Sequence, residues 1–184
     1  MGKNILAIDQ GTTGTTALIV DETLAIRGRA TREFRQVFPR PGWVEHEATA
    51  IWESVEAAVG AALKDAKVSP KEIAGIGITN QRETTCFFEH GASGKALHNF
   101  IVWQDRRTSQ RCQELRGAGL ESRVREKTGL VLDPYFSGTK MQWILENTPG
   151  APEKARDGKA LFGTIDTWLV HRLTGGRAFV TDAT

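Results

Sequence analysis

An amphipathic helix, predicted over residues 51–63 with strand-like segments on either side, constrains the fold more than any other feature. Its apolar positions recur at steps of three and four residues: Ile51, Val55, Ala58, Val59, Ala62 and Leu63. This period places them on one stripe of an α-helix, which must be buried against another element. Shortly after the helix, Ser69, Pro70 and Glu72 form a helix-start signature.

The segments around this helix predict strands. Residues 4–9, 15–20 and 24–34 predict three antiparallel strands, and a stretch with Pro and Gly at 38–47 separates them from the helix. Beyond the helix, the apolar segment 73–79 predicts a buried strand. Antiparallel strands followed by alternating helices and strands indicate an α/β fold with a mixed sheet and flanking helices.

The second half of the chain alternates between both kinds of element. Residues 84–89 and 96–103 predict strands flanking a turn at 90–95. Helices are predicted over 107–116, over 138–147, and over 165–174 with Trp168, Leu169 and Leu173 on one face. The last residues, 179–184, predict a strand or loop that is still under way, so we expect the chain to be incomplete.

Composition excludes several classes of protein. The 184 residues carry a net charge of only +2, which predicts no nucleic-acid partner, and no apolar run is long enough to span a membrane. The beginning of the chain lacks the layout of a signal peptide, and two cysteines are too few for a disulfide framework. These features predict a cytoplasmic protein.

The first candidate site follows the first strand. Asp9 lies where that strand ends, and Gly11 and Gly14 permit backbone geometries and close ligand approach that a Cβ forbids. Between and beyond them, hydroxyls come from Thr12, Thr13, Thr15 and Thr16. Turn N–H groups and hydroxyls of this kind can bind anions, so one interpretation is a phosphate loop with a magnesium-associated Asp9. The alternative is an ordinary hairpin turn.

A second candidate follows the 73–79 strand. Arg82 offers a fork of donors and Glu83 is a pure acceptor, a pair that suits a polyol whose hydroxyls donate and accept. Open α/β sheets bind ligands outside the carboxyl ends of their strands, which favours a site here. The alternative is a surface ion pair, which is common and weak.

Aromatic residues provide a third candidate. Trp103 ends a predicted strand and could pack against a carbon backbone, although it could equally be a core tryptophan. The loop 133–140 presents Tyr135, Ser137 and Thr139, and it is also compatible with a plain helix entry capped by Ser137.

Two other patterns indicate no site. The Gly-rich segment 91–96 is too short for a P-loop and has Ala96 in place of the magnesium-binding hydroxyl, so it predicts a turn. The four histidines show no metal-ligand spacing.

Together, several segments resemble the amino-terminal lobe of the glycerol-phosphorylating members of the FGGY family of carbohydrate kinases. They are "DQGTT", "WVEHE", "ITNQRETT", "IVWQDRR", "DPYFSGTKMQWIL" and "LFGTIDTWLVHRLTGG". The resemblance covers all 184 residues, and "NQRETT" with "DPYFSGTK" is its most specific part. It implies an actin-like, RNase H-like fold of two lobes, of which residues 1–184 are one incomplete lobe without the nucleotide lobe.

The resemblance also implies a reaction and roles for residues. The whole protein would use ATP and Mg²⁺ to phosphorylate glycerol to sn-glycerol 3-phosphate. Hydroxyls of glycerol would be bound by Arg82, Glu83 and Tyr135, with Trp103 packed on its carbons. The nucleotide phosphates would meet the turn residues Gly11, Thr12, Thr13 and Gly14, and Asp9 would hold magnesium through water.

Departures from the family pattern leave alternatives open. Relatives often carry Ser and Arg where this chain has Gly14 and Thr16, and the general-base Asp is expected beyond Thr184. The isolated chain is therefore predicted to be inactive, and the full-length protein is expected to be a homo-oligomer. The alternatives are another FGGY sugar kinase or a non-catalytic polyol-binding module.

Overall fold

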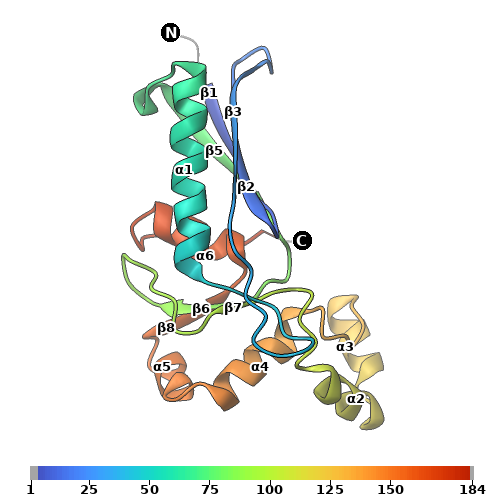
Figure 1. Ribbon diagram of the computed structural model, residues 1–184. Coiled ribbons are helices and arrows are strands. Elements are labelled where there is room, and N and C mark those ends of the chain that lie inside the picture. Colours follow the sequence, from blue (N-terminus) through green and yellow to red (C-terminus); the bar gives the residue numbers. More distant parts are fainter. Residues whose placement is uncertain (1–3, 183–184) are drawn as a thin grey trace. The chain divides into compact units, whose positions relative to one another are not determined.

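The computed structural model describes residues 4–182, which divide into two compact units (Figure 1). The first unit contains the residues up to Gln36 together with His46–Gln81. The second contains Val37–Glu45 and the residues from Arg82 onward. The short strand β4 (Glu45–His46) lies where the chain passes between them.

The first unit is built on the mixed sheet that the sequence predicts. Its strands are ordered β3-β2-β1-β5, with antiparallel pairing of β1 with β2 and of β2 with β3, and parallel pairing of β1 with β5. Their bounds are Asn4–Gln10 for β1, Gly14–Val20 for β2, Ile26–Glu33 for β3 and Ile73–Asn80 for β5.

Helix α1 (Ala48–Ala66) runs along this sheet (Figure 1). The predicted stripe is confirmed, because Ile51, Val55 and Ala58 are buried against it. The contact with β3 is close at Gly28, where a Cβ would lie 2.4 Å from the carbonyl oxygen of Ala62. Only glycine allows that approach of helix to strand.

Two predictions next to α1 need adjustment. The helix-start signature gives a capping box on Ser69 but only one turn of 3₁₀ helix, η1 (Pro70–Glu72). Strand β5 is not the buried strand that its apolar sequence predicts, because Ile76 is 50% exposed and none of the strand's residues is buried. The strand forms one edge of the sheet, which accounts for its exposure.

The second unit has short strands. β6 (Cys86–Glu89) pairs antiparallel with β8 (Ala160–Gly163), a strand that the sequence analysis missed. The predicted hairpin around 90–95 forms in part: Glu89 N–H donates to the Lys95 carbonyl, but the second strand shrinks to β7 (Phe100–Ile101).

Within the described residues, five α-helices complete the second unit. They are α2 (Ser109–Gly117), α3 (Glu121–Thr128), α4 (Ser137–Asn147), α5 (Ala151–Arg156) and α6 (Ile165–Leu173). The sequence analysis predicted α2, α4 and α6 and missed α3 and α5. On α6, Trp168 and Leu169 are buried as predicted, whereas Leu173 is 40% exposed. Phe87, Ile101 and Ile144 belong to this unit's core.

No helix in the described residues combines the length and the apolar character that crossing a bilayer requires. At the far end of the chain, residues 179–182 form no helix or strand. The rest of the predicted terminal segment, 183–184, lies outside the described residues.

Candidate functional site

The turn between β1 and β2 carries the predicted phosphate-binding residues. Gly11 N–H donates to the Gly14 carbonyl at 2.9 Å, which closes the turn. Neither glycine has a positive φ, so the expectation of unusual backbone geometry is wrong. Glycine serves packing instead, because a Cβ on Gly14 would lie 2.8 Å from the carbonyl oxygen of Arg32. The turn is a hairpin turn, and its phosphate binding stays a prediction.

The four threonines near this turn do not act as one group. The hydroxyl of Thr15 is buried and bonds that of Ser54 at 2.7 Å, and Thr16 bonds Thr31 at 2.9 Å on the neighbouring strand. The hydroxyls of Thr15 and Thr16 therefore bond residues outside the turn, and neither was predicted to bind phosphate. Thr12 and Thr13 are the hydroxyl residues in the turn itself.

Asp9 is exposed near the carboxyl end of β1, on the face opposite to the buried Ile8. Its register partners are Thr16 on β2 and Thr79 on β5, so hydroxyl residues flank it on both sides. Among residues 4–182, no three His, Cys, Asp or Glu side chains gather into a metal site. A single carboxylate with neighbouring hydroxyls fits a Mg²⁺ ion that keeps most of its water ligands.

Behind the turn lies a buried amide network that the sequence analysis did not identify. The side-chain nitrogen of Gln81 donates to Gln10 Oε1 at 3.0 Å and to the Gly11 carbonyl at 3.2 Å. It also lies 3.3 Å from Nδ1 of His46, whose ring is fully buried. These buried contacts hold the Gly11 carbonyl in place, and they therefore fix the backbone at the start of the β1–β2 turn.

His46 makes the stability of this network dependent on pH. Its Nε2 has no hydrogen-bond partner in the described chain, and burial lowers the pKa of the imidazole from 6.5 to about 4. The unfolded chain therefore binds one more proton than the folded chain between these values. Stability from this group is complete above about pH 6.5 and declines as pH falls toward 4.

We expect wild-type protein to lose about 2 kcal/mol more unfolding free energy than His46→Asn between about pH 7.5 and pH 5. Urea unfolding followed by circular dichroism measures this difference, and titration of the other groups is common to both proteins. The same substitution at the exposed His90 is the control and should follow the wild-type pH dependence. Equal slopes for wild type and His46→Asn would show that His46 is not the titrating group.

In the second unit, Glu83 is held in an unusual conformation by the first residue of α4. Its φ is 64°, in the left-handed region that non-glycine residues rarely adopt. The Ser137 N–H donates to Glu83 Oε2 at 2.9 Å, and the Ser137 hydroxyl donates to the same oxygen at 2.7 Å. Within residues 4–182 the hydrogen bonds to this carboxylate both use Oε2, so Oε1 can accept from a ligand. Ser137 is a partner of Glu83 and not the helix cap, which is Phe136.

Two of the other predicted substrate residues lie together. The rings of Trp103 and Tyr135 meet edge to face with their centroids 5.6 Å apart, and both residues are half-buried. The backbone N–H of Trp103 donates to the hydroxyl of the buried Thr84. Tyr135 lies two residues before Ser137, so the aromatic pair and Glu83 are linked through one short segment. Trp103 is thus not the core tryptophan of the alternative interpretation.

Arg82 is exposed and forms no ion pair with Glu83, so the simple surface-pair interpretation is wrong. A cavity of about 370 Å³ is bordered by Glu83 and by Ser137, with Phe162 and Thr167 among its other walls. Trp103 and Tyr135 do not line it. Of the four predicted substrate residues, Glu83 alone therefore faces this cavity.

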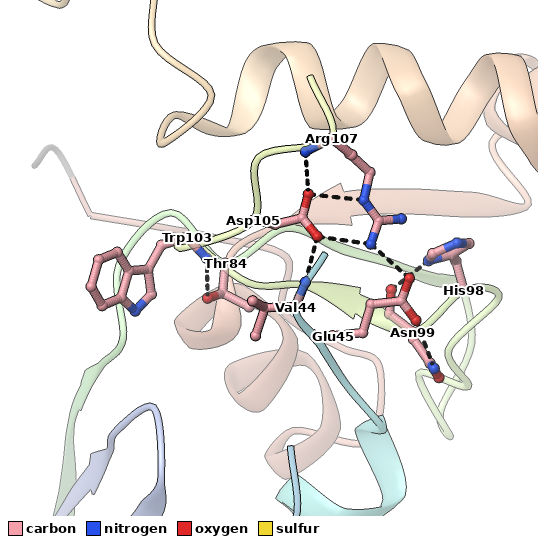
Figure 2. A network of polar contacts seen from close by, with 8 residues as sticks. All are labelled: Val44, Glu45, Thr84, His98, Asn99, Trp103, Asp105 and Arg107. Carbon is pink, nitrogen blue, oxygen red and sulfur yellow. Dashed lines mark hydrogen bonds and ion pairs between the residues drawn. The ribbon is translucent and has the colours of Figure 1, made fainter. Parts of the chain in front are cut away.

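A buried charge network supports the loop that follows Trp103 (Figure 2). Arg107 donates to both carboxylate oxygens of Asp105, each at 2.9 Å, and to Glu45 at 2.7 Å. Asp105 also accepts from Val44 N–H, and the Asn99 side chain donates to Glu45, as Figure 2 shows. The network joins the segment before β4 to the loop after β7.

Two tryptophans cover the same guanidinium. Its carbon lies 3.9 Å from the ring centroid of Trp43 and 4.5 Å from that of Trp143. The Arg107 and Asp105 side chains are 0% exposed. The sequence analysis predicted no partner for Arg107, because Glu45, Trp43 and Trp143 are distant from it in the sequence.

The comparisons with known proteins agree over the whole chain. Residues 4–184 match the N-terminal domain of the FGGY family of carbohydrate kinases. The chain is 56% identical over 180 residues to a glycerol kinase of Listeria welshimeri, covering 98% of this chain and 36% of that protein. It is 54% identical over 184 residues to a glycerol kinase of Brucella ovis, covering 100% of this chain and 37% of that protein.

A solved structure is also similar. The glycerol kinase of Plasmodium falciparum, determined with ADP, superimposes with a TM-score of 0.85 and 34% identity. The superposition covers 94% of this chain and 34% of the Plasmodium chain. The present chain thus spans little more than a third of the length of the relatives it matches.

Proposed function

Because this chain belongs to the FGGY family of carbohydrate kinases, we propose that the protein containing it transfers the γ-phosphate of ATP to glycerol, giving sn-glycerol 3-phosphate. The relatives described above are named glycerol kinases, and we extend that activity to the whole protein that contains this chain. In it, the described residues supply the glycerol contacts and one part of the phosphate site.

The conformation of Glu83 is the observation that carries this proposal. The carboxylate is fixed through Oε2 by Ser137, and its other oxygen can accept from a substrate hydroxyl. Strained backbone at a polar residue is typical of binding and catalytic sites. The edge of the Trp103–Tyr135 pair offers an apolar surface and a phenol hydroxyl beside the same segment. Such a combination suits a small polyol.

Arg82 fits this arrangement as a mobile donor. Its side chain is exposed and is bonded to no carboxylate in the described residues, so its donors are available to a hydroxyl. A fork of donors together with a fixed acceptor suits hydroxyls that both donate and accept.

The nucleotide would be bound at the β1–β2 turn. Gly11, Thr12, Thr13 and Gly14 would contact its phosphates, and Asp9 would orient the water ligands of magnesium. Magnesium would supply charge neutralisation at the transferring phosphoryl group. Asp9 itself would act as a fixed counter-charge at the carboxyl end of β1.

Replacing Asp9 with Asn in the full-length protein should raise the magnesium–ATP KM or lower kcat by about tenfold or more, because a counter-charge to the metal is lost. The fold should be unaffected, since the Asp9 side chain is exposed. Steady-state kinetics at varied magnesium and ATP measure the effect. Asp157→Asn, at an exposed aspartate paired with Lys159, is the control. If Asp9→Asn has the same kinetics as wild type, Asp9 does not act on magnesium or ATP and is only the residue near the end of β1.

Turnover of a panel of acceptors tests the proposed function. Full-length protein with magnesium and ATP should form ADP rapidly with glycerol and slowly with D-xylulose or gluconate. Preferential phosphorylation of a sugar would assign the protein to another FGGY activity. Absence of turnover with every acceptor would favour a non-catalytic polyol-binding module.

A further inference from the structure

The ammonium group of Lys140 occupies a core position in the second unit. Lys140 lies on α4, one turn before Ile144, and both side chains are 0% exposed. Lysine is almost never fully buried unless its charge is paired or its amine serves a defined contact. The sequence signal for it was present, since a lysine stands on the apolar face of a predicted helix.

Lys140 contacts the segment that carries Tyr135. Its Nζ donates to the carbonyl oxygen of Tyr135 at 2.6 Å. That carbonyl belongs to a turn closed from its other side by Asp133, which accepts the Tyr135 N–H at 2.8 Å. Lys140 and Asp133 therefore hold the peptide groups on both sides of Tyr135, while its ring contacts Trp103.

Charged groups surround the ammonium without pairing with it directly. Burial lowers the pKa of Lys140 to about 8, and Asp105, Glu83 and Asp133 oppose this shift, whereas Arg107 adds to it. Each of these carboxylates is already bonded elsewhere: Asp105 to Arg107, Glu83 to Ser137, and Asp133 to Arg106 and Tyr135 N–H. The charges that act on Lys140 thus include those of Glu83 and Asp133, which themselves bond Ser137 and the Tyr135 N–H.

We propose that Lys140 is a positioning residue, which fixes the Tyr135 turn and, through Ser137, the carboxylate of Glu83 in the arrangement that binds substrate. Ser137 begins the helix that carries Lys140, so a shift of the turn moves the N–H and hydroxyl that hold Glu83. Lys140 itself touches no reacting atom. The inference rests on the proposed function, because glycerol binding is its readout.

The test compares Lys140→Met with wild type in the full-length protein. Methionine has an unbranched side chain nearly as long as that of lysine and can be buried because it is uncharged, but it cannot donate a hydrogen bond to the Tyr135 carbonyl. We expect the glycerol KM to rise by about tenfold or more while kcat changes by less than about threefold, because binding geometry is lost and the chemistry is not. Lys159→Met, at a lysine whose side chain is 71% exposed, is the matched control and should match wild type.

The pH profile provides a readout that a merely structural residue would not change. In wild type, the glycerol KM at saturating ATP should rise by about threefold between about pH 7 and pH 9, as the amine loses its charge and the charge-assisted bond to the Tyr135 carbonyl weakens. The groups that face Lys140 are Glu83, Asp105, Asp133 and Arg107. Their own effects remain in Lys140→Met, which should show a flat profile over this range.

Each outcome decides the inference. An unchanged glycerol KM in Lys140→Met, or a pH profile identical to wild type, would overturn it. If Lys140→Met fails to fold, Lys140→Arg keeps a permanent charge and should abolish the pH dependence, and retention of that dependence would overturn the inference. Wild-type protein that phosphorylates sugars but not glycerol would instead overturn the proposed function.

Discussion

Replacing Arg107 with Ala should lower the free energy of unfolding by about 3–5 kcal/mol, because it leaves two buried carboxylates without their cation. Asp105 is 0% exposed and receives two bonds from the guanidinium, and Glu45 receives a third. The substitution also removes the cation that contacts the rings of Trp43 and Trp143. Urea unfolding followed by tryptophan fluorescence measures this loss, since four of the five tryptophans lie in the second unit.

The neighbouring arginine is a matched control. Arg106 forms an ion pair with Asp133 at 3.3 Å, but its side chain is 63% exposed. Arg106→Ala should therefore change stability by less than about 1 kcal/mol. Similar losses for the two variants would mean that the buried network does not stabilise the second unit as its geometry indicates.

Replacing Glu83 with Ala in the full-length protein should lower kcat/KM for glycerol by about 10- to 100-fold. The change removes the acceptor proposed for a substrate hydroxyl and leaves the Ser137 N–H without its carboxylate partner, while the Ser137 hydroxyl can still donate to the Glu83 carbonyl. A buried polar group left unpaired costs about 1–3 kcal/mol, which corresponds to this range. Glu83→Gln keeps the shape of the side chain and an acceptor oxygen, so its kcat/KM for glycerol should fall less than that of Glu83→Ala.

Two further variants make this result specific. Glu89→Ala removes a carboxylate that is 42% exposed and only 4.0 Å from Lys154, so it should leave glycerol kinetics unchanged. Arg82→Ala should raise the glycerol KM by about tenfold without affecting stability, because its side chain is exposed. Glycerol kinetics equal to wild type in both Glu83→Ala and Arg82→Ala would exclude this pair from the site.

Local patterns in the sequence predicted much of the first unit. Alternation and helical period are properties of short segments, so β1 to β3 and α1 were found within a few residues of their bounds. β8 was missed because it is four residues long and its partner β6 lies some seventy residues away in the sequence. Helix α3 was missed because its residues are mostly charged and none is buried.

The candidate site shows the same limit more sharply. Glu83 and Tyr135 could be named from residue type and from resemblance. The left-handed backbone of Glu83 and its bonds to Ser137 could not be predicted from the sequence, because they depend on a contact between residues 54 positions apart. The same holds for Arg107 and Glu45, and for Thr16 and Thr31, whose hydroxyls face each other because of the strand register.

We propose that this chain supplies the glycerol-binding part of a kinase, and that the proton acceptor belongs to another part of the protein. The most direct measurement is glycerol-dependent formation of ADP, made in parallel on the full-length protein and on residues 1–184 alone. We expect the full-length protein to turn over and the isolated chain to show no activity, because phosphoryl transfer needs the acceptor base and the remaining phosphate contacts in line with the substrate. Turnover by the isolated chain at ordinary kinase rates would place a base among these residues, and an inert full-length protein would contradict the proposed reaction.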